Sequence, residues 1–128
     1  MCIRDSPLTA DDFVFAFQRL VDPQTGSKYA SNGFIFQQGL AISRGEDAVN
    51  SLGVRALDSH TLEIELVDPL PYFLNFLSFY SFMPIPQHLF QNLQERGIDQ
   101  DLWTRPEHVI CNGAVSYTHL TLPTIYSV

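Results

Sequence analysis

The stretch from Leu52 to Val67 constrains the fold of this chain more than any other part of the sequence. Its second half alternates apolar and polar residues, which is typical of a β-strand with one buried face. The apolar positions are Leu62, Ile64 and Leu66, and the polar ones are Thr61, Glu63 and Glu65. The tripeptide Asp58-Ser59-His60 supplies turn-forming residues after the shorter apolar run Val54–Leu57. The stretch therefore predicts a β-hairpin whose apolar face other segments must cover.

The first segment able to cover the hairpin is a predicted helix from Ala10 to Val21. Thr9 suits the N-cap, and two aspartates follow in the first turn, where the helix dipole favours negative charge. An apolar stripe recurs at helical spacing. Its members are Phe13, Phe17 and Leu20. Pro23 ends the helix, because proline cannot continue its hydrogen-bond ladder.

Further elements are predicted on both sides of the hairpin from periodicity and from Gly and Pro positions. The predicted helices are an irregular one over Tyr29–Gln38, a short one over Tyr72–Leu77, and one over Gln87–Arg96 that stops at Gly97. Three irregular segments are also predicted: a polar surface loop over Ala41–Ser51 that turns at Gly45, an apolar link over Ser78–Pro86, and a loop over Asp99–Glu107. Trp103 is expected to anchor the last of these loops. A short strand at Val109 and Ile110 is predicted to follow it. The fold class is therefore α+β, with helices packed on a β-hairpin.

Composition and charge argue against several classes of function. Apolar residues make up 45% of the 128 residues, which is too much for a disordered chain. Fourteen acidic residues against seven basic ones give a net charge of −7, which argues against binding to nucleic acid or to anionic lipid. The uncharged stretch Pro69–Gln94 is interrupted by prolines, so we expect no insertion of this segment into a membrane.

The two ends of the chain differ in character from the centre. Residues 1–6 (MCIRDS) and 115–128 (VSYTHLTLPTIYSV) resemble translated adapter sequence, and the tail has neither charge nor a clear period. We therefore predict three parts: a non-native end at 1–6, a domain at 7–114 and a non-native tail at 115–128. The cysteines Cys2 and Cys111 allow one disulfide, but the position of Cys2 in the foreign end argues against it.

Few residues suggest catalysis or metal binding. The sequence holds neither a phosphate-binding loop nor a nucleophile-elbow motif. His108 and Cys111 lack a second spaced pair of ligands, so we expect no metal site and no cofactor. Two other classes of function stay open. One is a small metal-dependent hydrolase that uses His88, His108 and Glu107, and the other is a free-standing interaction domain.

Tyr29 is the residue that we single out as a candidate for ligand contact. It follows a glycine-containing turn and a lysine, and its phenol offers both an apolar ring and a hydrogen-bonding group. Core or surface packing remains the alternative for this side chain. A second group of aromatic residues follows the hairpin and is expected to lie mostly in the core, with a minority lining a cleft. These residues are Tyr72, Phe73, Phe76, Phe79, Tyr80 and Phe82.

A series of blocks in fixed order carries a family resemblance. The blocks are Pro7–Phe15, Gln18–Thr25, Ser27–Ser31, Leu52–Asp58 with Thr61–Glu63, Pro69–Phe73, Pro84–Pro86 and Asn112–Ala114. In this order and spacing they resemble the oligopeptide-binding branch of the extracellular solute-binding proteins, family 5. These proteins are the substrate-capturing subunits of peptide ABC importers. The resemblance covers nearly everything outside the two unusual ends.

The resemblance implies a fold and a function. Residues 7–114 would be an interior fragment, most of the smaller middle domain of a two-lobed periplasmic-binding-protein clamshell. The protein would capture oligopeptides without catalysis, with the membrane permease subunits of an ABC importer as partners. Its location would be periplasmic or extracellular, with or without a lipid anchor. Other cargoes of the family remain open, namely murein peptide, dipeptide or a nickel complex.

The resemblance also implies a binding residue. The ligand-contacting tyrosine of the oligopeptide branch lies in the segment that matches Ser27–Ser31, so its role falls on Tyr29. The other peptide contacts of the family lie in lobes that this chain lacks. We therefore expect the isolated segment to bind peptide too weakly to measure.

Overall fold

The structure is a computed structural model that describes residues 7–105 and 107–109. The chain divides into two compact units, Thr9–Ile85 and a second unit that joins Met1–Leu8 with Pro86–Val128. No helix in the described part of the chain is both long and apolar enough to span a bilayer. The first unit holds the predicted hairpin and Tyr29.

Helix α1 (Ala10–Val21) has the bounds that the sequence predicts. Thr9 is its N-cap, and the Thr9 N–H donates to Asp12 Oδ2 at 3.1 Å, which satisfies one backbone donor at the helix start. Phe17 and Leu20 of the predicted stripe are buried, and Phe13 is half-buried against the core. The amphipathic pattern of this segment is therefore sufficient to explain both its bounds and its buried face.

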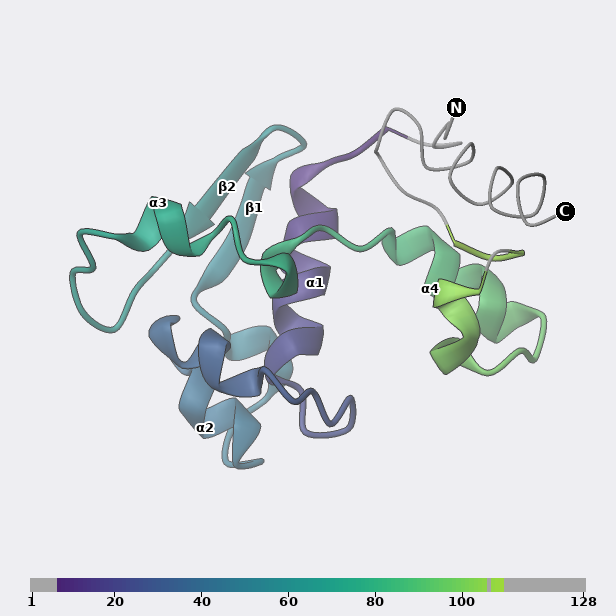
Figure 1. The fold of residues 1–128 in the computed structure, drawn as a ribbon, viewed down its shortest axis with the longest axis horizontal. Coiled ribbons are helices and arrows are strands. Elements are labelled where there is room, and N and C mark those ends of the chain that lie inside the picture. Colours follow the sequence, from purple (N-terminus) through teal and green to yellow (C-terminus); the bar gives the residue numbers. More distant parts are fainter. Residues whose placement is uncertain (1–6, 106, 110–128) are drawn as a thin grey trace, which may run out of the picture. The chain divides into compact units, whose positions relative to one another are not determined.

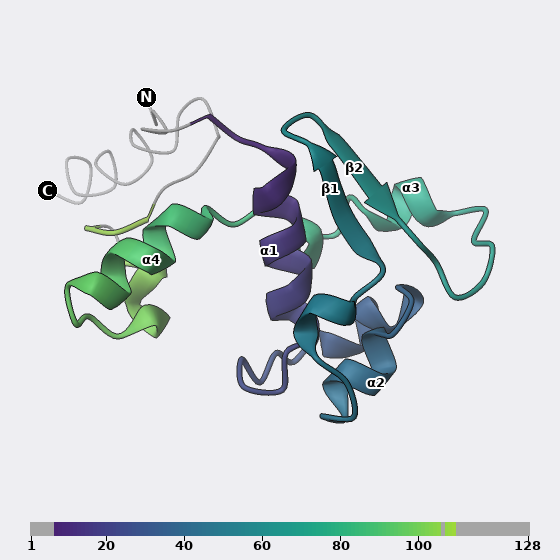
Figure 2. The ribbon, with the colours of Figure 1, turned by 180° about the vertical axis from the view of Figure 1, so that it is seen from behind.

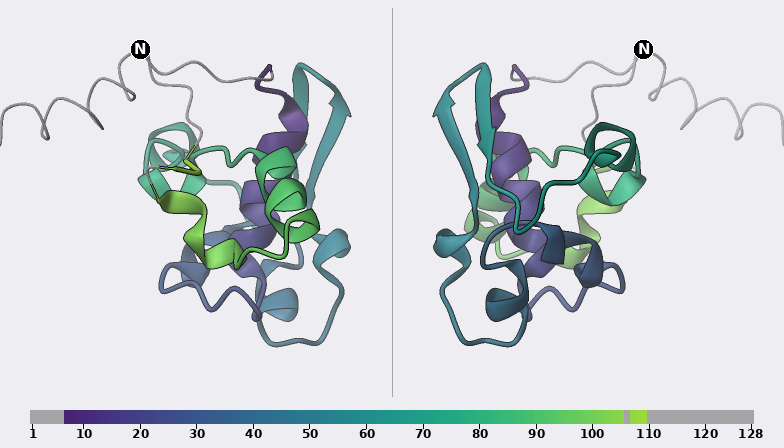
Figure 3. Two further views of the ribbon diagram at one scale, coloured as in Figure 1. Left: turned by 90° about the vertical axis from the view of Figure 1, so that its right-hand side faces the viewer. Right: turned by 90° about the vertical axis from the view of Figure 1, so that its left-hand side faces the viewer.

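Strands β1 (Val54–Asp58) and β2 (Thr61–Ile64) form the predicted antiparallel hairpin. The register pairs Val54 with Ile64 and Ala56 with Leu62, and a bulge near the turn leaves Leu57 outside the pairing. Leu62, Ile64 and Leu66 pack against the core, as the alternation predicts. The hairpin lies along α1 in all views (Figures 1, 2 and 3), and the Ala10 N–H donates to the Ser59 carbonyl at 3.0 Å.

A third extended segment at Phe36 and Gln37 pairs with the chain on either side of the hairpin. Phe36 forms a bridge with Leu66, and the Gln37 N–H donates to the Glu65 carbonyl at 2.9 Å. The Gly53 N–H donates to the Gln37 carbonyl, also at 2.9 Å. The prediction of a helix from Tyr29 to Gln38 is therefore wrong at Phe36–Gln38, because the backbone groups of Phe36 and Gln37 bond to the base of the hairpin.

The first half of that predicted helix forms the 3₁₀ helix η1 (Ala30–Ile35). The prediction of a surface loop over Ala41–Ser51 is only partly right. Gly45 does turn the chain with a φ of +75°, but two short elements flank it, the helix α2 (Gly39–Ser43) and the 3₁₀ turn η2 (Val49–Ser51). The physical reason is Ile42, which is 1% exposed and fixes α2 to the core.

Aromatic rings form the centre of the first unit. Phe17 of α1 stacks on Phe36, with ring centroids 5.2 Å apart. Phe82 meets both rings edge-on, at 5.7 and 5.9 Å. The three rings come from segments far apart in the sequence, so together they hold α1, the extended segment and the chain after the hairpin in one core.

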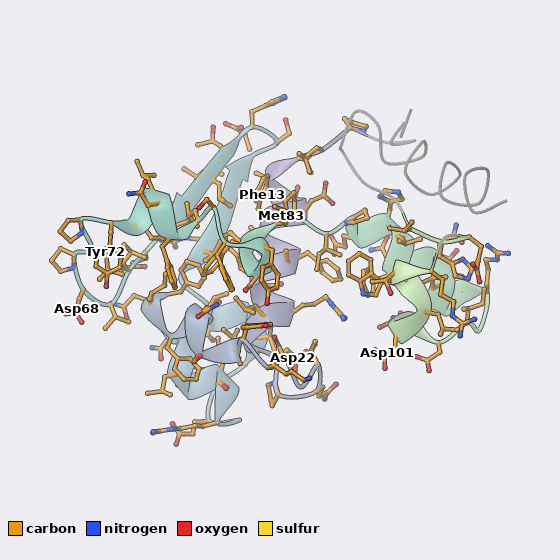
Figure 4. The ribbon with its side chains drawn as sticks, viewed as in Figure 1. Phe13, Asp22, Asp68, Tyr72, Met83 and Asp101 are labelled. Atoms are coloured by element: carbon orange, nitrogen blue, oxygen red, sulfur yellow. The ribbon has the colours of Figure 1, made fainter. Side chains whose placement is uncertain are left out.

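After the hairpin come α3 (Phe73–Phe76) and the 3₁₀ turn η3 (Tyr80–Phe82). The predicted helix over Tyr72–Leu77 is confirmed, since Tyr72 and Leu77 are the caps of α3. Figure 4 shows Tyr72 on the loop side of α3, well apart from Met83, which directly follows η3.

In the second unit, α4 (Gln87–Glu95) confirms the predicted helix to within one residue, and Gly97 ends it with a φ of +67°. The 3₁₀ turn η4 (Gln100–Thr104) lies in the predicted loop, and Trp103 anchors it by packing on Phe90 with ring centroids 5.6 Å apart. Val109 is not in a strand, because its N–H donates to the Arg105 carbonyl at 2.8 Å in a turn. Ile110 lies outside the described residues.

Candidate ligand-contact surface

Tyr29 lies at the start of η1, at a position fixed by its backbone. Its N–H donates to Ser27 Oγ at 3.2 Å, and its carbonyl accepts the Asn32 N–H at 2.9 Å. The residue is 42% exposed, so the phenol is neither buried in the core nor fully in solvent. The structure excludes core packing for Tyr29, whereas packing at the surface and contact with a ligand both remain open.

Two aromatic residues lie against Tyr29: Phe79, which directly precedes η3, and Tyr80, the first residue of η3. Its ring lies edge-on to Phe79, with centroids 5.7 Å apart, and edge-on to Tyr80 at 5.2 Å. Phe79 and Tyr80 contact each other in turn, at 4.4 Å. We name these three residues the Tyr29 cluster. Phe79 is 37% exposed and Tyr80 53% exposed, so all three rings keep part of their surface in solvent.

The core holds both halves of the Tyr29 cluster in place. Phe82, two residues after Tyr80, is buried among Phe17 and Phe36. Asn32 of η1 donates through Nδ2 to Ser81 Oγ at 3.3 Å, which ties the segment of Tyr29 to that of Tyr80. The cluster is therefore a surface feature on a rigid base, the arrangement that gives aromatic side chains a low entropic cost of binding.

The hydroxyl groups of the cluster interact with each other. A hydrogen bond with the Tyr29 side chain raises the pKa of Tyr80, with desolvation and the charge of an ionised Tyr29 as smaller causes in the same direction. The raised pKa favours the protonated form of the Tyr80 phenol. The Tyr29 cluster offers phenol hydroxyl groups and partly exposed ring surface, a combination suited to an uncharged polar chain with apolar side groups.

The prediction that the aromatic run after the hairpin lies mostly in the core is half right. Phe82 is buried, and Phe73 and Phe76 pack against the core. Tyr72, Phe79 and Tyr80 are exposed. The partners of Tyr29 were therefore missed by sequence reasoning. A spacing of three joins Phe79 to Phe73, Phe76 and Phe82, which pack in or against the core, so this spacing does not identify Phe79 or Tyr80.

The residues of the alternative metal site lie in the second unit. His88 belongs to α4, while Glu107 and His108 follow η4, where the His108 N–H donates to the Arg105 carbonyl at 2.8 Å. Across residues 7–105 and 107–109, no three His, Cys, Asp or Glu side chains gather as metal ligands. His88, Glu107 and His108, which the structure describes, are therefore not gathered as a set of metal ligands. Cys2 and Cys111 lie outside the described residues.

Comparison with known proteins assigns the chain to a family. The family model of the bacterial extracellular solute-binding proteins, family 5 (middle) matches residues 5–119. The predicted limits of the domain at 7 and 114 remain a prediction.

Relatives in Escherichia coli K12 give the same assignment. The chain is 39% identical over 113 residues to the periplasmic oligopeptide-binding protein OppA, a match that covers 85% of this chain and 19% of the relative. It is 41% identical over 112 residues to the probable deoxycholate-binding periplasmic protein YgiS, covering 84% and 19%. The chain thus spans about a fifth of the length of these relatives.

The structure is also similar to solved members. The crystal structure of Haemophilus influenzae OppA in complex with the peptide RPPGFSPFR matches with a TM-score of 0.77 and 35% identity, over 85% of this chain and 20% of that one. The unliganded open form of the murein tripeptide-binding protein MppA matches with a TM-score of 0.75 and 36% identity, over 88% and 22%. The chain belongs to the bacterial extracellular solute-binding proteins, family 5.

Proposed function

We propose that this chain forms one wall of the ligand site of an oligopeptide-binding protein, the substrate-capturing component of a peptide ABC importer. The observation that carries the proposal is the Tyr29 cluster: three partly exposed aromatic rings on a rigid base, in a chain of a family of extracellular solute-binding proteins. The protein acts by binding, without catalysis and without a cofactor.

The relatives support a peptide as the cargo. OppA of Escherichia coli is an oligopeptide-binding protein, and OppA of Haemophilus influenzae was solved in complex with a nonapeptide. An extended peptide offers main-chain carbonyl and N–H groups at regular spacing, together with varied side chains. The phenol groups of the Tyr29 cluster can bond to the main chain while the rings accept apolar side chains.

Partners and location follow from the same assignment. The ligand is an oligopeptide, and the membrane permease subunits of the importer receive it. The named Escherichia coli relatives are periplasmic, which supports a periplasmic location for this protein. We place the protein outside the cytoplasmic membrane, either free or lipid-anchored.

Binding of RPPGFSPFR to the protein expressed from its complete gene tests the proposal. Isothermal titration should give saturable binding, and Tyr29→Ala should weaken it by about tenfold, since aromatic anchors contribute disproportionately at such sites. Tyr72→Ala is the matched control, because Tyr72 is also exposed but takes no part in the ring contacts of the cluster. Saturable binding of deoxycholate or murein tripeptide with no binding of RPPGFSPFR would overturn the peptide assignment.

A further inference from the structure

We propose that Asn32 is a positioning residue: its side chain holds the Tyr29 cluster in the arrangement that binds peptide, without touching the peptide itself. The inference rests on the proposed function and adds to it a residue that acts through Tyr29. It starts from the hydrogen bond that Asn32 Nδ2 donates to Ser81 Oγ at 3.3 Å.

The side-chain bond of Asn32 joins the two halves of the Tyr29 cluster. Asn32 belongs to η1, which Tyr29 precedes, and Ser81 belongs to η3, 49 residues further along the chain. Across the described part of the chain, no other hydrogen bond joins residues 27–35 to residues 78–83. The ring contacts at 5.2 and 5.7 Å also join the two segments, but such contacts are less directional than a hydrogen bond.

The backbone around Asn32 transmits its position to Tyr29. The Asn32 N–H donates to the Tyr29 carbonyl at 2.9 Å. The next residue, Gly33, is buried, and a Cβ atom there would lie 2.3 Å from Val21 Cγ1, so η1 packs directly on α1. Asn32 itself is half-buried, whereas Tyr29 is 42% exposed. The residue that sets the position is therefore sheltered, and the residue that it positions is open to a ligand.

Ser81 is anchored to the core on the other segment. Phe82, which follows it, is 2% exposed and meets two other core rings edge-on. Tyr80, which precedes it, is 53% exposed and belongs to the Tyr29 cluster. The bond to the Ser81 hydroxyl thus ties Asn32 to a position that the core fixes, and a cluster held in this way needs little reorganisation when a ligand arrives.

The size of the effect follows from the population of the positioned cluster. Loss of one hydrogen bond between neutral groups changes an equilibrium constant by about three- to tenfold. Without the bond, the binding arrangement of the cluster is populated less, and the apparent Kd for peptide rises by the factor by which that population falls. The hydrogen bond therefore affects affinity although neither of its partners contacts the ligand.

Isothermal titration of RPPGFSPFR into the protein expressed from its complete gene tests the inference. Asn32→Leu, which removes the amide and keeps the approximate size of the side chain, should raise the Kd about three- to tenfold, and Ser81→Ala should do the same. Ser81→Thr, which keeps the hydroxyl group, should retain the affinity. Ser78→Ala is the matched control, because the Ser78 hydroxyl donates to the Asn75 carbonyl at 2.6 Å, within its own segment.

A second readout separates positioning from a general effect on the fold. Because Asn32 acts through Tyr29, Asn32→Leu should weaken binding little further once Tyr29→Ala has removed the ring, whereas damage to the fold would weaken binding in both backgrounds. If the parent protein binds RPPGFSPFR but Asn32→Leu binds as well as Ser78→Ala, or if its effect is unchanged in the Tyr29→Ala background, the inference is wrong and the proposed function stands. If the parent protein binds no peptide, the proposed function fails and the inference fails with it.

Discussion

At the scale of single residues, two positions at the start of α2 separate the effect of backbone conformation on stability from the effect of steric contact. Gln38 has a φ of +65°, in the left-handed region that disfavours side chains with a Cβ atom. Its neighbour Gly39 is constrained by contact instead, because an added Cβ would lie 2.1 Å from the Gly33 carbonyl oxygen. Glycine is therefore favoured at both positions, at 38 by the backbone conformation and at 39 by the steric contact.

We predict that Gln38→Gly stabilises α2 by about 0.5–1 kcal/mol, because it removes the left-handed strain. Gly39→Ala should destabilise it by more than about 1 kcal/mol, because backbone atoms must move apart. Hydrogen exchange of the Ile42 amide, which donates to the Gln38 carbonyl at 2.9 Å, measures both effects.

Gly45→Ala is the control for this pair. Gly45 has a φ of +75°, but a Cβ there would meet nothing within 4 Å, so its cost is conformational alone and about 1 kcal/mol. A Gly39→Ala variant as stable as the parent protein would contradict the close packing of η1 on α2.

At the scale of elements, the hairpin turn depends on an ionised carboxylate. Asp58 Oδ1 accepts the His60 N–H at 2.7 Å, and Asp58 Oδ2 accepts the Thr61 hydroxyl at 2.8 Å. These two hydrogen bonds lower the pKa of Asp58 below its ordinary value. The bond from the His60 backbone has the larger effect, and the bond from the Thr61 side chain comes next. The folded state therefore favours the ionised form.

We predict that the turn loses stability in acid. Because the pKa is lower in the folded state, the stabilisation is complete above the ordinary aspartate pKa and disappears as pH falls through the lowered value. Carboxyl NMR titration should find Asp58 titrating below an ordinary aspartate. Asp58→Asn should weaken the turn at neutral pH and remove this pH dependence. An Asp58 that titrates at the ordinary value would refute the role given to these two bonds.

The elements also show how much of the fold the sequence can predict. Helix α1 and the hairpin follow from local patterns, because an apolar stripe at helical spacing and strict alternation each leave one buried face. Phe36 and Gln37 could not be predicted in this way. Their extended conformation depends on hydrogen bonds to Glu65 and Gly53, which are distant in sequence and leave no local period.

The candidate site, like the fold, could be predicted from the sequence only in part. Tyr29 could be singled out by the family resemblance and by its place after a turn, and the structure finds it at the surface. Phe79 and Tyr80 could not be assigned to it, because a run of aromatic residues gives no sign of which rings face the core. Burial of Phe82 decides this, since it directs the preceding residues towards Tyr29.

At the scale of the whole molecule, the chain is one family 5 segment that spans about a fifth of its curated relatives. Its exposed ion pair between Arg55 and Glu63, at 2.6 Å, contributes little to stability. The Tyr29 cluster differs because its rings are contiguous and held by the core. The central claim is that this cluster touches the transported peptide.

The most direct test is the crystal structure of the protein expressed from its complete gene, with RPPGFSPFR bound. We predict that the exposed part of the Tyr29 ring contacts the peptide and that the Tyr29 hydroxyl lies within hydrogen-bond distance of a peptide oxygen. A complex in which the peptide is bound elsewhere, while other parts of the protein cover the Tyr29 cluster, would contradict the account.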